Sequence, residues 1–85
     1  MVSVKHLVLD VLKPHQPNVL DFARAIAVLG EDYRVDIRVV EVDEQTETLQ
    51  VEIEGGELYF ERISSAISEI GASIHSIDEV SVVGK

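Results

Sequence analysis

The side chains with the clearest capacity for chemistry in this 85-residue sequence are its carboxylates and histidines. The chain has 16 acidic residues, three histidines and no cysteine. Carboxylate oxygens are hard ligands that suit Ca²⁺ or Mg²⁺, whereas the lack of cysteine excludes disulfides and thiolate metal sites. If the protein has a cofactor, we therefore expect Ca²⁺ or Mg²⁺ bound by carboxylates.

One candidate cation site involves Asp10 and Glu52. Asp10 interrupts the most apolar run of the sequence and shares one face of an extended strand with His6. Those two residues are four positions apart, roughly 13 Å in a strand, so they cannot bind one ion directly. A cation site at Asp10 needs a ligand from a neighbouring strand, and Glu52 is the candidate. The alternative is structural: half-buried histidines commonly have no function, and His6 and Asp10 then lie in a subunit interface.

A second candidate cation site is the acidic turn formed by Asp43 and Glu44, between two alternating apolar runs. Its spacing lacks the regular alternation of an EF-hand loop. A solvated hairpin tip is the simpler interpretation.

His15 and His75 are candidate ligand contacts. His15 follows Pro14 at the end of the first strand, where a loop can line a site, although an exposed histidine in a stiff turn is the simpler interpretation. His75 lies beside Ser76 and Asp78, but residues of one extended strand cannot converge on a single reacting atom as a Ser-His-Asp triad must. No other nucleophile–base pair can be placed, so we expect a binding protein rather than an enzyme.

The elements that position these residues follow from hydrophobic periodicity. Alternation predicts strands, and apolar residues at helical spacing predict helices; the expected elements are strands over 2–12, 33–43, 48–54 and 73–83 and helices over 18–29 and 59–70. Asn18 is the expected N-cap of the first helix. Gly30 and Gly71 are expected to end the two helices, and a β-bulge is expected near Ser76. The strand-helix-strand-strand-helix-strand order predicts a single α+β domain over residues 1–85. We expect a ferredoxin-like βαββαβ sandwich, a four-stranded antiparallel sheet with both helices on one face.

The sheet face without helices predicts self-association. Simple alternation places apolar side chains of two strands on that face, and a soluble monomer rarely leaves such a strip wet. The expected interface residues are Val4, His6, Val8, Leu12, Val40 and Val42.

The net charge of -9 excludes several partner classes. Nucleic acids and anionic membranes are bound by cationic side chains, and only seven lysines and arginines are present. The sequence shows neither a signal peptide nor an apolar run long enough to span a membrane. We therefore expect a cytoplasmic protein that binds neither nucleic acid nor membrane.

Three segments resemble a small archaeal family of uncharacterised proteins, domain of unknown function 211. The opening run 7–17, the hairpin turn 41–47 and the closing run 70–80 carry the resemblance, which covers nearly the whole chain. Similar proteins usually have Asp at the position of Tyr59 and Gly at that of Ala72. The resemblance implies the ferredoxin-like fold, an archaeal source and self-assembly into homo-oligomeric rings, and it implies no reaction.

Two functions remain open on these grounds. One is a small oligomeric, ring-forming binding or regulatory module that takes a divalent cation or an unidentified small molecule. The other is a self-assembling structural protein without ligand or catalysis.

Overall fold

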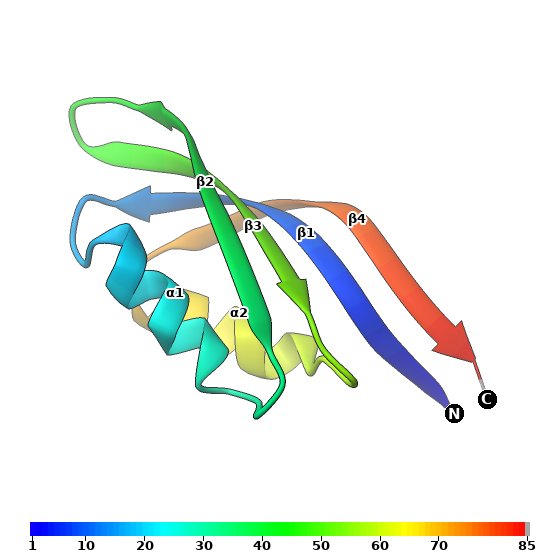
Figure 1. Cartoon of the computed structure of the whole chain (residues 1–85). Coiled ribbons are helices and arrows are strands. Elements are labelled where there is room, and N and C mark those ends of the chain that lie inside the picture. The colour runs from blue at the N-terminus through cyan, green and yellow to red at the C-terminus, as the bar shows by residue number, and fades with distance from the viewer. Residues whose placement is uncertain (85) are drawn as a thin grey trace.

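The computed structural model describes residues 1–84 and contains four strands and two helices. In chain order these are β1 (Val2–Pro14), α1 (Val19–Ala27), β2 (Arg34–Val42), β3 (Thr46–Glu54), α2 (Phe60–Glu69) and β4 (Ser73–Gly84). The strands form one antiparallel sheet in the order β2-β3-β1-β4. Both helices lie on the same face of this sheet (Figure 1). The predicted α+β ferredoxin-like fold is confirmed, with β1 and β3 as the central strands.

The core lies between the sheet and the helices. Leu7, Leu9 and Val11 alternate along β1 and are at most 2 % exposed. Their counterparts on β3 and on the two helices are equally buried: Leu49, Val51, Ile53, Phe22, Ile26, Ile63 and Ile67. Each such side chain contributes roughly 1.5–3 kcal/mol on burial, so this layer holds the sheet in place. The opposite face of the sheet, which we call the open face, carries no helix (Figure 1).

The two helices begin in different ways. Asn18 caps α1 as predicted, because its Oδ1 accepts a hydrogen bond from the Asp21 amide at 2.8 Å. Tyr59 at the start of α2 has no side-chain capping bond. Its amide donates instead to the Tyr33 hydroxyl at 2.9 Å, and its ring lies 5.1 Å from the Arg62 guanidinium. The start of α2 is therefore held in place by a tertiary hydrogen bond and a cation–π contact, while no side chain caps its first amides.

The two helices end differently from one another. Helix α2 ends as predicted at Gly71, whose φ of 93° is favourable only for glycine. The amides of Gly71 and Ala72 donate to the carbonyls of Ser68 and Ile67, the Schellman pattern. Helix α1 ends earlier than predicted, with Val28 as its C-cap rather than Gly30. Gly30 has a different role, since a Cβ there would collide with the Tyr33 ring.

Bulges change which residues face which side of the sheet. A bulge adds one extra residue that has no partner on the neighbouring strand. In β4, His75 and Asp78 are such extra residues and lie on either side of Ser76, where one bulge was predicted. Lys5 in β1 and Val40 in β2 are extra residues of the same kind. Each extra residue breaks the simple two-residue alternation of the strand.

Two residues expected on the open face are displaced by these bulges. Val4 packs against the core. Val42 is the cross-strand partner of Glu47, and Glu47 is the partner of Lys13. Lys13 lies on the same face of β1 as the buried residues Leu7, Leu9 and Val11, so Val42 lies on the helix-covered face of the sheet. The placement of Val4 and Val42 on the open face is therefore wrong.

No helix among residues 1–84 has the length and apolar character needed to cross a membrane.

Candidate functional site

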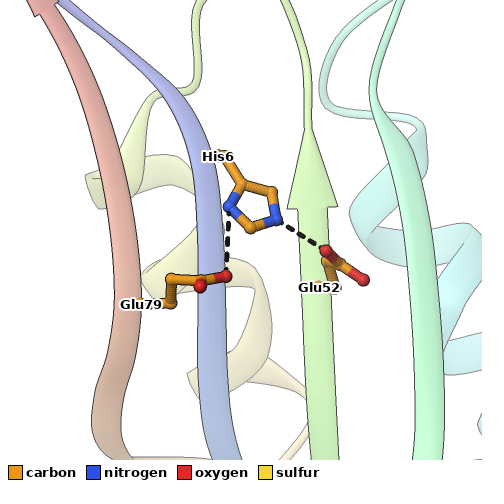
Figure 2. Close-up of side chains that lie close together, drawn as sticks. All are labelled: His6, Glu52 and Glu79. Atoms are coloured by element: carbon orange, nitrogen blue, oxygen red, sulfur yellow. Dashed lines mark hydrogen bonds and ion pairs between the residues drawn. The ribbon is translucent and has the colours of Figure 1, made fainter.

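A cluster of one histidine and two glutamates lies on the open face, with one residue on each of three adjacent strands. His6 comes from β1, Glu52 from β3 and Glu79 from β4 (Figure 2). The His6 Nε2 atom lies 2.6 Å from Glu52 Oε2, and Nδ1 lies 3.5 Å from Glu79 Oε1. One potential ligand atom from each residue can be chosen so that all three lie within 4.8 Å of one another. We call these three residues the His6 cluster.

Strand register brings the cluster together. Glu52 and Glu79 are the cross-strand partners of Val8 on the two sides of β1. Val8 and His6 lie two residues apart on the same face, so the imidazole reaches diagonally to both carboxylates. The extra residue Asp78 in β4 sets the register that gives Glu79 this position. Val8 lies between the two glutamate-bearing strands and is only 8 % exposed.

The cluster favours a charged histidine. Both ring nitrogens of His6 face carboxylate oxygens, which only accept hydrogen bonds, so the imidazolium form can donate on both sides. The hydrogen bond to Glu52 raises the pKa of His6 above its ordinary value, burial opposes this, and the charges of Glu52 and Glu79 reinforce it. The protonated cluster ties together three strands on a face that lacks a helix.

The same atoms offer a metal ion a mixed ligand set. One imidazole nitrogen and two carboxylates are found at Zn²⁺ sites, which use His nitrogen and Asp or Glu oxygen. Ligand atoms in such a site lie about 2 Å from the ion, so the carboxylates must close in around one ring nitrogen. Glu79 can do this because its side chain is 64 % exposed.

A second network surrounds Lys13, whose side chain is 0 % exposed. Its Nζ donates to the carbonyls of Pro14 at 2.7 Å and Pro17 at 2.6 Å, with the carbonyl of His15 at 3.4 Å. Glu47 Oε1 forms an ion pair with Nζ at 3.0 Å without hydrogen-bond alignment. We call Lys13, His15 and Glu47 the Lys13 network. It holds the loop between β1 and α1 against β3.

His15 ties that loop to the β2–β3 turn. Its Nδ1 lies 3.2 Å from Glu47 Oε2, and its Nε2 lies 3.0 and 3.1 Å from the carbonyls of Asp43 and Glu44. Every one of these partners is an acceptor, so this histidine is also suited to the imidazolium form. The hydrogen bond to Glu47 and those to the turn carbonyls raise the pKa of His15.

Of the two turn residues proposed as cation ligands, Asp43 has its carboxylate engaged in hydrogen bonds, whereas the contact that Glu44 makes is through its backbone carbonyl. Asp43 Oδ1 accepts hydrogen bonds from the amides of Gln45 and Thr46 and from the Thr46 hydroxyl. These bonds lower the pKa of Asp43. Its carbonyl and that of Glu44 face the His15 ring rather than an open position.

Asp10 lies apart from the His6 cluster. It is paired in register with Gln50 and Ser76, and it lines a hollow of about 460 Å³ together with His75 and residues of β1, β3 and β4. Glu52, expected beside Asp10, instead hydrogen-bonds His6. Asp10 and His75 therefore share a hollow, while Glu52 belongs to a different group.

The expected interface residues on the open face differ in how much surface they offer. Val8 is already buried in the single chain, whereas Leu12 is 43 % and Val40 62 % exposed. Charged and polar groups separate them, including the hydrogen bond from Arg38 to Gln50. The open face is therefore a polar surface with isolated aliphatic side chains rather than a contiguous apolar strip.

Sequence reasoning missed several central residues, among them Lys13, Glu47 and Glu79. Lys13 continues the two-residue spacing of Leu7, Leu9 and Val11. Because alternate residues of a strand lie on the same face, this spacing indicates that the Lys13 side chain points toward the core. Glu79 gave no comparable signal, because its place beside His6 depends on the extra residue in β4.

Comparison with known proteins identifies the family. A sequence model of the family DUF211, described as "Uncharacterized ArCR", matches residues 5–85. "Uncharacterized protein MJ0319" from the archaeon Methanocaldococcus jannaschii is 45 % identical over 85 residues, covering 100 % of this chain and 87 % of that protein. The chain belongs to DUF211, an archaeal family of unknown function.

Proposed function

We propose that this DUF211 protein is a small, self-associating module that binds a divalent metal ion through His6, Glu52 and Glu79. The observation that carries the proposal is the convergence of these three side chains from three strands, with one ligand atom of each within 4.8 Å of the others. The open face gives an ion direct access from solvent, since no helix covers it (Figure 1). Binding, without catalysis, is the activity proposed.

The donor set indicates which ions fit. Carboxylates alone suit Ca²⁺ and Mg²⁺, but an imidazole nitrogen favours Zn²⁺ and other first-row transition ions. Three protein ligands leave a coordination position for water or a small molecule. We therefore propose Zn²⁺ as the preferred ion, with Ca²⁺ and Mg²⁺ bound more weakly.

Proton and metal compete for His6. A metal ion needs the lone pair of one ring nitrogen, so it must displace a proton from the imidazolium. The carboxylates that raise the pKa of His6 are the groups that also attract the ion. Affinity for Zn²⁺ should therefore fall as the pH decreases through the pKa of His6, and binding should release a proton.

Calorimetric titration with Zn²⁺, Mn²⁺, Ca²⁺ and Mg²⁺ tests the proposal. We expect one Zn²⁺ per chain and at least a tenfold loss of affinity in His6→Gln and in Glu79→Gln. The matched controls are His75→Gln, which changes an exposed histidine of β4, and Glu57→Gln, which changes an exposed glutamate outside the sheet. Both controls should retain wild-type affinity.

The opposite result supports a structural role. If Zn²⁺ does not bind, or binds equally to His6→Gln, the His6 cluster is a set of cross-strand contacts and the alternative of a structural protein without ligand takes its place. Thermal melting provides a second readout, because a ligand specific for the native state raises its melting temperature.

Self-association is part of the proposal. Several valines and one isoleucine of β4 are about half exposed: Ile77, Val80, Val82 and Val83. Exposed apolar side chains on an edge strand favour an interaction there. The resemblance to ring-forming proteins points the same way.

A further inference from the structure

We propose that a hollow on the open face, near the end of β1, binds a small primary amine whose ammonium group is held by the Asp10 carboxylate. The hollow, which we call the Asp10 hollow, has a volume of about 460 Å³. It is lined by residues of β1, β3 and β4: Asp10, Leu12, Thr48, Ser73, Ile74 and His75. It shares no residue with the His6 cluster, so this site is separate from the proposed metal site.

Strand register assembles the Asp10 hollow from distant parts of the chain. Leu12 of β1 is the cross-strand partner of Thr48 on one side and of Ser73 on the other. Asp10 lies two residues before Leu12 and therefore on the same face of β1. No helix covers this face (Figure 1), so a small molecule can reach the hollow directly from solvent.

Two bulges in β4 bring further polar side chains beside Asp10. His75 and Asp78 are the extra residues, and Ser76, the cross-strand partner of Asp10, lies between them in the chain. His75 lines the Asp10 hollow, and Asp78 lines an adjoining hollow that also includes Asp10 and Thr48. Bulges are over-represented next to functional sites, where they redirect side chains. Two bulges opposite one carboxylate indicate a stretch of β4 that is shaped for a ligand.

The polar side chains of the hollow are available to such a ligand. His6 and His15, the other two histidines, are both engaged with glutamates. In contrast, Asp10, Thr48 and His75 take no part in the side-chain hydrogen bonds or ion pairs formed among residues 1–84. Their hydrogen-bonding capacity can therefore be used without breaking a contact of the fold.

These groups match a primary ammonium group. The Asp10 carboxylate accepts hydrogen bonds, and the hydroxyls of Thr48 and Ser73 can accept as well, which provides three kinds of oxygen acceptor for three N–H donors. Neither the Asp10 hollow nor the adjoining one is lined by lysine or arginine, so the charge of the lining favours a cation. Leu12, which is 43 % exposed, offers contact to a hydrocarbon body.

An organic cation fits this hollow better than a bare metal ion. Ca²⁺ takes six to eight oxygen ligands, whereas Asp10 is the only carboxylate that lines the Asp10 hollow. Among residues 1–84, ligand atoms of three potential metal-binding residues lie within 4.8 Å of one another at the His6 cluster, which does not include Asp10 or His75. The volume is instead that of a small-molecule pocket, for which roughly 300–1,000 Å³ is usual.

Titration of ¹⁵N-labelled protein with butan-1-amine tests the proposal, with EDTA present to remove metal ions. Amide signals around Asp10, Thr48 and His75 should shift together and reach saturation. Two other probes separate the contributions: butan-1-ol has the same chain without the charge, and tetramethylammonium has the charge without an N–H donor. Both should bind at least tenfold more weakly than butan-1-amine.

Variants locate the site. Asp10→Asn removes the charge at nearly constant volume and should lower the affinity for butan-1-amine at least tenfold. Asp36→Asn is the matched control, because Asp36 also lies on the open face, as the cross-strand partner of Glu52, but pairs with Arg34 outside the hollow. It should keep wild-type affinity. Asp10→Asn should also bind Zn²⁺ like wild type, and a dispersed amide spectrum verifies that each variant is folded.

Several results would overturn the proposal. Butan-1-ol binding as tightly as butan-1-amine would leave only an apolar contact, and tetramethylammonium binding as tightly would leave only general attraction to an acidic surface. Unchanged affinity in Asp10→Asn, or shifts that do not saturate, would also exclude an amine site at Asp10. None of these outcomes bears on Zn²⁺ binding by the His6 cluster, and a failure to bind Zn²⁺ would leave the amine site unaffected.

Discussion

Replacing Lys13 with methionine should severely destabilise the protein. The side chain is completely buried, and its ammonium group is held by Pro14 and Pro17 carbonyls and by Glu47. Methionine has a similar volume, so packing is largely kept. What is lost is the ammonium group that donates to the Pro14 and Pro17 carbonyls and pairs with Glu47, whereas His15 still contacts Glu47.

The magnitude follows from breaking a buried ion pair on one side. Removing one partner of such a pair typically costs about 3–5 kcal/mol. In Lys13→Met the Pro14 and Pro17 carbonyls lose their donor, and Glu47 keeps only its contact with His15. An 85-residue domain has a total stability of ~4–13 kcal/mol. A loss of that size lowers the melting temperature of a small domain by about 12–40 °C.

Urea unfolding monitored by circular dichroism measures this effect. Lys5→Met is the matched control: Lys5 makes one exposed hydrogen bond, to the Gly56 carbonyl, so its replacement should cost less than about 1 kcal/mol. The double variant with Glu47→Gln should lose less than the sum of the single changes, since the two residues interact. If Lys13→Met were within about 1 kcal/mol of wild type, the Lys13 network would not hold the β1–α1 loop as described.

Three further predictions concern pH and the helix ends. The free energy of unfolding should be highest between pH 4.5, the ordinary pKa of Glu47, and pH 6.5, that of His15. The pKa values of His6 and His15 are raised in the folded protein, so these residues stabilise it below pH 6.5, and this contribution is lost as the pH rises through the folded-state pKa values. The pKa of Glu47 is lowered in the folded protein, so this residue contributes stability above pH 4.5 that is lost on acidification. Urea unfolding midpoints across pH 3–9 without a maximum between pH 4.5 and 6.5 would contradict this prediction. Gly71→Ala should cost about 1–2 kcal/mol in urea unfolding because of its positive φ, and a neutral effect would exclude strain there. Asn18→Ala should cost about 0.5–2 kcal/mol through loss of the cap, whereas Asn18→Asp should retain most of that stability.

The fold was largely predictable because its signals are local. Alternation in β1 and β3, helical spacing around Phe22 and Ile63, and the N-cap Asn18 each depend on a few neighbouring residues. The order of the elements then limits the topology to very few arrangements. The α1 end was placed too late because Gly30 looked like a C-cap, while it is required by the Tyr33 ring.

The site was less predictable because it depends on register. Counting alternate residues fails after each extra residue, which is why Val4 and Val42 were assigned to the wrong face. Glu52 was chosen for its outward position, but its partner was expected to be Asp10 rather than His6. No pattern in a single sequence shows that a bulge at Asp78 will bring Glu79 next to a histidine of another strand.

Nuclear magnetic resonance of the histidine side chains tests the metal proposal most directly. With ¹⁵N-labelled protein, one equivalent of Zn²⁺ at neutral pH should shift a ring nitrogen of His6 to the range of a metal-bound imidazole and leave His15 and His75 unchanged. Glu79→Gln should weaken this response at least tenfold. A His6 spectrum that does not respond to Zn²⁺, or a response confined to His75, would contradict a metal site at His6, Glu52 and Glu79.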